Sequence, residues 1–305
     1  MEGRLYAPKG RSHIPILRRK YMSITAQMVK ELREMTGAGM MDCKKALQEV
    51  EGDLEKAVDW LRQKGIAKAA KKSGRATSEG LVTAAVSADG KAVALASVCC
   101  ETDFVARGEK FQAFAASVSQ LVLDKDPADA AALDALLGDE LQAQIATVGE
   151  NMTLGNFARI ERKGPGAIGL YIHSNNKIGV AVDIETGDDA TVNKAEFQEL
   201  AKNLAMQIAA ASPLAVDPSC LDQSVVERER EVYRQKALEE GKPANIVEKI
   251  VEGAVKKFHK EVCLLEQLFI RDDKKTIADV IKEASKALGD KVTVIKFVRI
   301  QLNAE

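Results

Sequence analysis

The residue types that support covalent catalysis are scarce in this sequence. The chain of 305 residues has three histidines, His13, His173 and His259, and five cysteines. It contains no CxxC, HExxH or GxxxxGK[ST] pattern. Residues 164–169 match GxGxxG, but we expect a strand and a hairpin after them, where a dinucleotide site requires a helix. An enzyme is therefore the weaker interpretation, and we expect no cofactor and no bound metal.

Two of the cysteines, Cys99 and Cys100, are adjacent in a stretch typical of a β-strand. Neighbouring side chains of a strand point to opposite faces, which disfavours a disulfide or a shared metal. We expect buried thiols that act as small apolar residues. The enzyme alternative would instead predict a reactive thiol at one of these positions, together with turnover of a small substrate.

The charge balance favours a protein as the partner. Lys and Arg number 44 and Asp and Glu number 45, so no overall positive charge attracts nucleic acid or an anionic membrane. No apolar run approaches the ~20 residues that a membrane-spanning helix needs. The odd number of cysteines fits a reducing compartment, and we expect a cytoplasmic protein with no membrane and no direct nucleic-acid partner.

The first 21 residues differ in composition from the rest of the chain. They carry six basic side chains against the single acid Glu2, together with two prolines. We predict a basic disordered extension over residues 1–21. An organellar transit peptide is the alternative, although such peptides are usually longer and richer in serine. Met22 is a second candidate for the natural start.

A three-helix domain is predicted over residues 22–65. Thr25 is a suitable N-cap, Gly37 a suitable helix stop and Asp53 a further N-cap. Apolar residues recur at i, i+3, i+4 and i+7 in the helices, so each has one apolar stripe. The unit resembles the ubiquitin-associated fold. Residues 66–79 are basic and predict a linker; no aromatic side chains interleave with the charges, so RNA binding is not predicted there.

The middle of the chain contains an internal repeat with a spacing of 86 residues. Asp89-Gly90, a signal for a two-residue hairpin turn, corresponds to Asn175-Asn176, and Phe111 corresponds to Phe197. A hairpin followed by an amphipathic helix thus occurs twice. We predict a core of two subdomains, the first over 80–163 and the second over 164–221 and 261–305, with the sheets buried under the helices.

A helical hairpin is predicted as an insertion in the second subdomain. Residues 222–240 and 244–260 are helical stretches, and Gly241-Lys242-Pro243 stops the first and starts the second. The first arm has few apolar positions, so a narrow seam is expected between the arms of a protruding coiled coil over 222–260. A last helix and strand follow at 276–288 and 291–302, and the fold class is α+β.

The repeat loses its symmetry at one place. Thr102-Asp103-Phe104 in the first copy corresponds to Asp188-Asp189-Ala190 in the second, so only one copy carries an aromatic ring there. A surplus apolar residue at a junction between a strand and a helix is typical of a binding site. In the alternative interpretation, Phe104 packs onto its own helix as a hydrophobic staple, with Thr102 or Asp103 as the N-cap.

Two long motifs carry a resemblance to a known family. Residues 32–47 read LREMTGAGMMDCKKAL and residues 100–107 read CETDFVAR. They resemble, in order, the two signatures of bacterial translation elongation factor Ts, and the similarity runs from about Met22 to the final strand. The resemblance implies a guanine-nucleotide exchange factor that promotes GDP release from elongation factor Tu and is not an enzyme with a bond-making site.

The resemblance also implies which residues contact elongation factor Tu. The second motif provides Thr102, Asp103, Phe104 and Val105; its Asp and Phe are inserted in the family near the magnesium and phosphates of the bound nucleotide. The N-terminal helices and the end of a core strand are also contact regions in the family. In this sequence they provide Leu32, Arg33, Met40, Lys44 and His173.

The sequence departs from the family pattern in two respects. The family usually has Glu and Asn where this chain has Ser97 and Cys99, and the chain ends soon after its last strand, so we expect no C-terminal helical module.

The partners expected are elongation factor Tu with GDP or without nucleotide, and a second copy of the chain as a homodimer within that complex. The alternative function is an interaction adaptor with no exchange activity.

Overall fold

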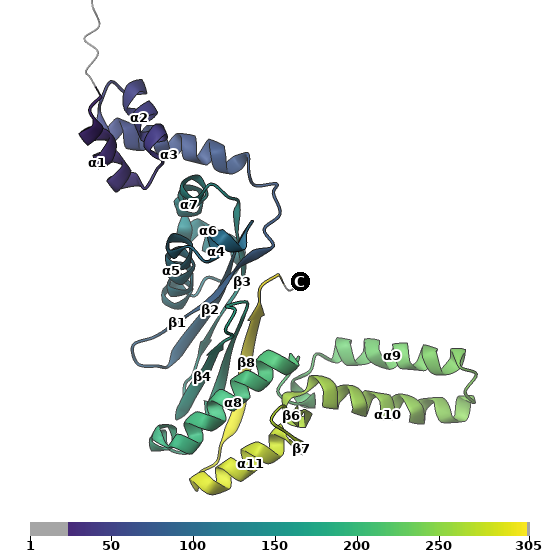
Figure 1. Ribbon diagram of the computed structural model, residues 1–305. Helices are drawn as coiled ribbons and strands as arrows, with labels where there is room; N and C mark the ends of the chain where they lie inside the picture. Colours follow the sequence, from purple (N-terminus) through teal and green to yellow (C-terminus); the bar gives the residue numbers. More distant parts are fainter. Residues whose placement is uncertain (1–23, 304–305) are drawn as a thin grey trace, which may run out of the picture. The chain divides into compact units, whose positions relative to one another are not determined.

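The computed structural model describes residues 24–303 and has an α+β fold (Figure 1). The extension expected over residues 1–21 lies outside the described part of the chain. The chain divides into two compact units, residues 1–67 and 68–305. The first is helical over its described residues, and the second holds all the strands of residues 24–303.

The N-terminal unit contains three helices, α1 (Ala26–Thr36), α2 (Met40–Glu49) and α3 (Leu54–Ala70). The Met28 N–H donates to Thr25 Oγ1 at 3.2 Å, which caps α1 as predicted. Gly37 ends the helix with φ 66°, a conformation that glycine adopts without steric cost. The apolar stripes meet in a small core of fully enclosed side chains, among them Leu32, Cys43, Ala46, Leu47 and Ala57.

The third helix is longer than the sequence predicts. We expected a linker from residue 66, whereas α3 continues through Gly65 to Ala70. An interior glycine costs a helix about 1 kcal/mol, and the alanines that follow it are the best helix formers. Ala69 is also buried in the hydrophobic cluster of the first core copy, which favours the additional turn. The connection to the first strand is therefore confined to residues 71–78.

The two copies of the core share one plan, in which a hairpin is followed by a short helical turn, a long helix, further helix and a third strand. The first copy has β1 (Glu79–Val86), β2 (Ala92–Cys100), α4 (Asp103–Ala106), α5 (Glu109–Lys125), α6 (Ala130–Leu137), α7 (Glu140–Val148) and β3 (Met152–Glu161). The second has β4 (Gly166–Ile172), β5 (Ile178–Glu185), η1 (Asp189–Asn193), α8 (Ala195–Ala211), α11 (Ile277–Leu288) and β8 (Thr293–Gln301). Helices α5 and α8 begin and end 86 residues apart, as the repeat predicts.

Each copy forms a three-stranded antiparallel sheet, with strand orders β1-β2-β3 and β4-β5-β8. The inner faces of the sheets pack on one another through an apolar cluster that includes Val82, Leu95, Ala181 and Ile300. Helix α5 covers the outer face of the first sheet, and α8 and α11 cover that of the second (Figure 1). This layering buries both sheet faces, as predicted for the duplicated module.

The first hairpin turns through four residues, not the two predicted at Asp89-Gly90. The Ser87 N–H donates to the Ala92 carbonyl at 2.9 Å, which leaves residues 88–91 in the loop. Asp89 Oδ1 accepts from Ser87 Oγ at 2.7 Å and from the Lys91 N–H at 3.0 Å. These bonds stabilise the longer loop, and Gly90 supplies its positive φ of 69°.

The second hairpin repeats this loop. The His173 N–H donates to the Ile178 carbonyl at 2.9 Å, and the Asn176 N–H donates to the His173 carbonyl at 2.8 Å. Asn175 Oδ1 accepts from the Lys177 N–H at 3.0 Å, and Asn176 takes the positive φ of 54°. An asparagine amide thus replaces the aspartate carboxylate at the same position of the turn.

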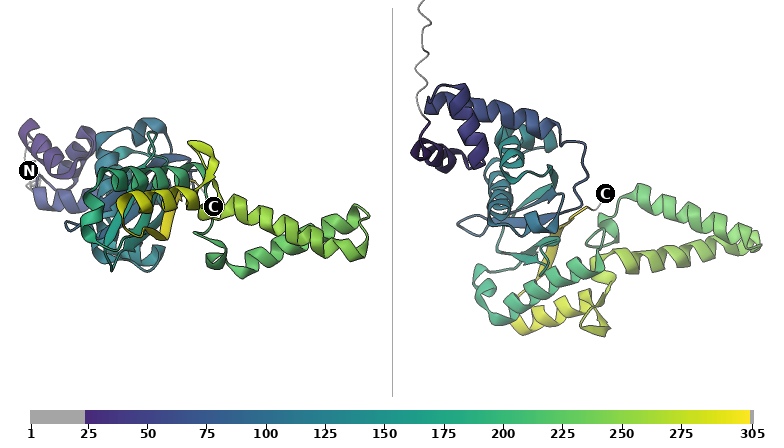
Figure 2. Two further views of the ribbon diagram at one scale, coloured as in Figure 1. Left: turned by 90° about the horizontal axis from the view of Figure 1, so that it is seen from below. Right: turned by 45° about the horizontal axis from the view of Figure 1, so that its top comes forward.

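A helical hairpin, α9 (Gln223–Glu239) and α10 (Ala244–Val262), extends away from the second sheet (Figure 2). Its seam is lined by Val226, Ala237, Val247, Val251 and Val255, and Arg234 pairs with Glu248 across it at 2.9 Å. Val232 and Ile250, two further apolar residues of the arms, are exposed. Short elements connect the hairpin to the core: η2 (Pro218–Cys220), η3 (Leu264–Glu266), β6 (Leu268–Phe269) and β7 (Asp272–Thr276).

Within residues 24–303, no helix has both the length and the apolar character needed to cross a membrane.

Candidate functional site

Residues 103–106 form α4, a single helical turn between β2 and α5 that follows Thr102. Thr102 caps α4, because its Oγ1 accepts from the Val105 N–H at 3.4 Å. Asp103 pairs with Arg107 one turn later, with Nη2 and Oδ2 3.0 Å apart. The Phe104 side chain is 85% exposed, so it does not pack onto its own helix as a hydrophobic staple. The N-cap prediction is therefore confirmed for Thr102. The hydrophobic-staple interpretation of Phe104 is wrong.

The turn is fixed to the core by its inward residues. Ala106 is buried in the hydrophobic cluster of the first copy, and Val105 packs against the same cluster. The Gly108 N–H donates to the Val105 carbonyl at 2.9 Å, and α5 begins at the next residue. Phe104 therefore projects from a backbone that is anchored on both sides.

A glutamate from a distant loop also holds the turn. Glu150 lies in the loop between α7 and β3, and its Oε2 accepts from the Thr102 N–H at 3.0 Å. Its Oε1 accepts from Thr102 Oγ1 at 2.8 Å. Cys100 Sγ donates to the Thr102 carbonyl at 3.2 Å. The backbone and the hydroxyl of Thr102 are both bonded, and no local sequence pattern marks Glu150 as their partner.

The same loop anchors the segment that follows α3. The Asn151 N–H donates to Glu101 Oε1 at 2.6 Å, and this bond is the main cause that holds the pKa of Glu101 below its usual value. Arg75 pairs with Glu101 at 3.4 Å and lowers that pKa further. Asn151 Nδ2 donates to the Arg75 carbonyl at 2.7 Å. The loop that holds Thr102 therefore also fixes residues 73–75.

The N-terminal unit presents a different set of side chains. Arg33, Met40 and Lys44 are exposed, and Met40 keeps 59% of its surface. Leu32 is fully enclosed in the core of the unit, so it supports the helices and has no free surface for direct contact. The exposed methionines Met35 and Met41 belong to the same motif and add to the apolar surface.

His173 belongs to the second copy and follows directly after β4. It is half-buried, and its Nδ1 lies 2.9 Å from the Tyr171 hydroxyl. The two rings are tilted at 58° with their centroids 6.0 Å apart. Its hydrogen-bond partner lies on β4, so the structure does not bring His173 into the turn at residues 102–105.

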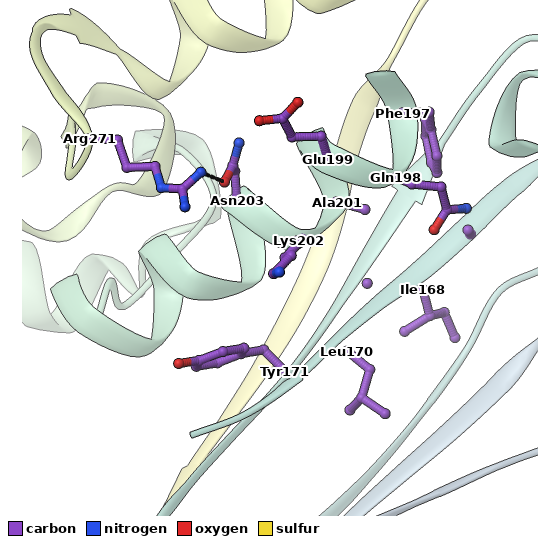
Figure 3. Close-up of a pocket in the computed structure, with 12 residues that line it drawn as sticks. Ile168, Leu170, Tyr171, Phe197, Gln198, Glu199, Ala201, Lys202, Asn203 and Arg271 are labelled. Carbon is purple, nitrogen blue, oxygen red and sulfur yellow. Dashed lines mark hydrogen bonds between the residues drawn. The ribbon is translucent and has the colours of Figure 1, made fainter. Parts of the chain in front are cut away.

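An open groove of about 680 Å³ lies between β4 and α8 (Figure 3). Ile168, Leu170 and Tyr171 line it from the strand, and Lys202 lines it from the helix. Arg271 Nη1 donates to Asn203 Oδ1 at 2.9 Å across its far end. Its lining contains no Cys, Ser or His, so it offers no Cys–His or Ser–His pair of nucleophile and base.

The two adjacent cysteines behave as small core residues. Cys100 lies in the cluster beneath α5 and Cys99 in the cluster between the sheets, on opposite faces of β2 as predicted. Both are free and buried. Burial, and after it the Glu150 carboxylate, raises the pKa of the Cys100 thiol to about 12. Over residues 24–303 no cluster of three His, Cys, Asp or Glu side chains is placed to hold a metal ion.

The arrangement suits contact with another macromolecule better than covalent chemistry. The core offers an aromatic ring on a fixed turn with an acid beside it. The N-terminal unit, taken by itself, offers exposed Arg, Lys and Met side chains. A large apolar side chain exposed on a rigid element is typical of an anchor in a protein interface.

Comparison with known proteins agrees with this geometry. The chain matches the family described as Elongation factor TS over residues 101–304. It is 71% identical to Elongation factor Ts of Desulfovibrio desulfuricans over 284 residues, which cover 93% of this chain and 99% of the relative. It is 58% identical to that of Nitratidesulfovibrio vulgaris strain DP4, with 93% and 97% covered, and 54% identical to that of Lawsonia intracellularis, with 93% and 100% covered. The chain therefore belongs to the elongation factor Ts family.

Proposed function

We propose that this chain is a guanine-nucleotide exchange factor that releases GDP from elongation factor Tu during protein synthesis in the cytoplasm. Membership of the elongation factor Ts family supports the exchange role. The proposal assigns the central contact to Asp103 and Phe104, here named the wedge, which inserts near the magnesium and phosphate site of the GTPase.

Exchange of this kind needs no covalent step. The factor must bind the nucleotide-free GTPase more tightly than the nucleotide-bound form, and linkage then weakens nucleotide binding by the same factor. Only contacts that differ between the two states of the GTPase contribute to this coupling. The factor engages both states, the GDP-bound one first and the nucleotide-free one as product.

The exposure of Phe104 is the observation that carries the proposal. A ring that is 85% exposed on a fixed turn keeps nearly all of its apolar surface for a partner. Burying a phenylalanine side chain contributes about 1.5–3 kcal/mol. Each 1.4 kcal/mol used to distort the nucleotide site is about a tenfold loss of GDP affinity. One side chain can thus account for a large acceleration of release.

The remaining site residues are assigned supporting contacts. Arg33, Met40 and Lys44 present charged and apolar surface on the N-terminal unit for the GTPase domain of elongation factor Tu. His173, oriented by Tyr171, contacts another domain of the same partner. The enclosed Leu32 acts indirectly by holding α1 in place. The homodimer within the complex stays a prediction from the sequence.

Release of a fluorescent GDP analogue from elongation factor Tu tests the proposal. Nucleotide-loaded Tu is mixed with excess unlabelled GDP, and the release rate is followed as the concentration of the chain rises. We expect saturable acceleration by orders of magnitude. An interaction adaptor would bind elongation factor Tu and leave the release rate at its spontaneous value, and that outcome would reject the exchange function.

A further inference from the structure

The two copies of the core hold equivalent turns with equivalent carboxylates. Thr102 in the first copy and Asp188 in the second are 86 residues apart, and each follows the middle strand of its sheet. The Thr102 N–H donates to Glu150 at 3.0 Å, and the Asp188 N–H donates to Asp290 at 3.1 Å. Glu150 and Asp290 both come from the loop before the third strand of their copy. A carboxylate at this place is therefore part of the duplicated fold.

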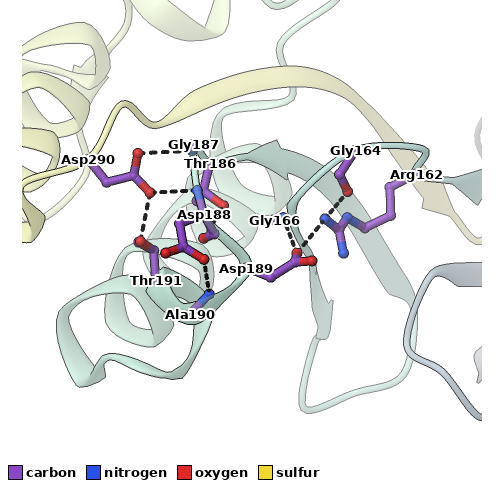
Figure 4. A network of polar contacts seen from close by, with 10 residues as sticks. All are labelled: Arg162, Gly164, Gly166, Thr186, Gly187, Asp188, Asp189, Ala190, Thr191 and Asp290. Carbon is purple, nitrogen blue, oxygen red and sulfur yellow. Dashed lines mark hydrogen bonds and ion pairs between the residues drawn. The ribbon is translucent and has the colours of Figure 1, made fainter.

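The second-copy contact is the more extensive of the two (Figure 4). Asp290 Oδ1 accepts from the Gly187 N–H at 2.9 Å, and its Oδ2 accepts from the Asp188 N–H and from Thr191 Oγ1, the latter at 2.6 Å. In the first copy, among residues 24–303, both carboxylate oxygens of Glu150 accept hydrogen bonds from the same residue, Thr102. The Glu150 carboxylate thus acts on the one residue that lies immediately before the wedge.

The turns differ in what they expose. The first presents Phe104, whereas the second has Ala190 at the corresponding position. The acids differ too: Asp189 accepts from the Gly166 N–H at 3.1 Å, whereas the ion pair of Asp103 within residues 24–303 is with Arg107 of its own turn. The second copy thus ties its acid to its own sheet, and the first leaves its acid and ring at the surface.

The α4 turn is short, so it depends on the contacts that fix its two ends, and the bonds from Thr102 to Glu150 are among them. The helix is four residues long, which is below the length at which a helix is stable by itself. Phe104 adds no packing, so Val105 and Ala106 provide the apolar contacts of the turn. The bonds from Glu150 fix the residue that caps the helix, and the direction in which Phe104 projects follows from that cap.

We propose that Glu150 is a positioning residue for nucleotide exchange: its carboxylate holds the Thr102 cap so that the wedge is ordered before the partner binds. This inference rests on the proposed exchange function. A pre-ordered side chain loses less conformational entropy on binding, so more of its contact energy goes into distorting the nucleotide site. Asp290 makes the equivalent contact in the second copy, where it stabilises the fold and has no role in exchange.

The duplicated core supplies its own control for the test. Glu150→Ala and Asp290→Ala remove equivalent carboxylates, but only the first lies beside an exposed ring. For Glu150→Ala we expect the maximal rate of GDP release from elongation factor Tu to fall about tenfold or more, while the factor concentration giving half-maximal acceleration changes less than about threefold. Asp290→Ala should lower the thermal unfolding midpoint and leave both exchange parameters near wild type.

A structural readout separates positioning from a general loss of stability. In the full chain without partner, hydrogen exchange at the amides of residues 103–108 should accelerate in Glu150→Ala and stay unchanged in Asp290→Ala. Glu150→Gln should restore most of the rate, because the amide oxygen can accept from the Thr102 N–H while the amide nitrogen donates to the hydroxyl. Thr102→Val removes the hydroxyl that donates to Glu150, and we expect a partial loss of the maximal rate of GDP release.

Phe104→Ala, measured beside these variants, distinguishes a failure of the Glu150 positioning role from a failure of the wedge. If Phe104→Ala loses acceleration and Glu150→Ala does not, the positioning role is wrong and the exchange function stands. Equal losses in Glu150→Ala and Asp290→Ala would also overturn the positioning role, since a fold effect would explain both. Normal exchange by Phe104→Ala would reject the wedge itself.

Discussion

Gly80 and Gly166 make the same close contact in the two copies of the core. Gly80 is the second residue of β1 and Gly166 is the first residue of β4. Both have a positive φ, 145° and 133°, and a Cβ on either would overlap a carbonyl oxygen of the neighbouring strand, that of Val98 or Ile184. The equivalence shows that the repeat extends to backbone conformation. It also explains why both positions exclude a side chain.

Alanine at either glycine should destabilise the core. We expect Gly80→Ala and Gly166→Ala each to lower the free energy of unfolding by about 1–3 kcal/mol or more, from backbone strain and overlap. Gly253 is the matched control, since it lies inside α10 with open space around it. Gly253→Ala should raise the free energy of unfolding by about 0.5–1 kcal/mol. Chemical denaturation measures all three, and a neutral Gly80→Ala would show that the contact is not as close as described.

Leu32 and Met40 should separate stability from binding in the N-terminal unit. Leu32→Ala opens a cavity in an enclosed core and should cost about 2–5 kcal/mol, seen as faster hydrogen exchange across α1 and α2 in the full chain. Met40→Ala removes an exposed side chain and should leave that exchange unchanged while weakening binding to elongation factor Tu. If Met40→Ala alters protection and Leu32→Ala does not, the assignment of core and surface is wrong.

Thiol reactivity should single out one cysteine. Burial raises the pKa of the Cys43, Cys99, Cys100 and Cys263 thiols, so almost none of them is thiolate near pH 8. Cys220 is exposed. A colorimetric disulfide reagent should therefore react rapidly with one thiol per native chain, and with none in Cys220→Ser. Five thiols should react after denaturation, and two or more rapid native thiols would contradict the burial of the other four cysteines.

Asp290 should contribute to loss of stability in acid. The bond from the Thr191 hydroxyl is the main cause that lowers the pKa of Asp290, followed by the backbone N–H bonds. A lowered folded pKa means that the stabilisation is fully present above the unfolded value of about 3.9 and is lost as the pH falls through the lower folded value. The unfolding midpoint should thus fall less between pH 6 and pH 3 in Asp290→Asn than in the wild type; parallel curves would argue against this role.

The sequence predicts the parts of the fold that depend on local pattern. The apolar stripes and caps place the helices to within a few residues, and the 86-residue spacing predicts the duplicated core because Phe111 and Phe197 occupy the same buried place. The extension of α3 was missed because a glycine usually marks a helix end. The β6–β7 hairpin was missed because the charged run at residues 271–275 has no strand pattern.

For the site, the sequence predicts the exposed element but not what holds it. Phe104 stands out because its counterpart is alanine, a comparison that needs no structure. Glu150 acts on Thr102 from 48 residues away along the chain, and no local pattern reveals such a contact. Leu32 and its exposed neighbour Met35 are both apolar residues of α1, and only the packing of the helices shows which of them faces the core.

The most direct test is GDP release from elongation factor Tu by the Phe104→Ala variant. Val232→Ala is its control, because Val232 is also exposed, at 53%, but lies on the helical hairpin. The account predicts that both variants unfold like the wild type, that Val232→Ala accelerates release normally, and that Phe104→Ala loses about tenfold or more of the acceleration. Wild-type acceleration by a folded Phe104→Ala protein would contradict it.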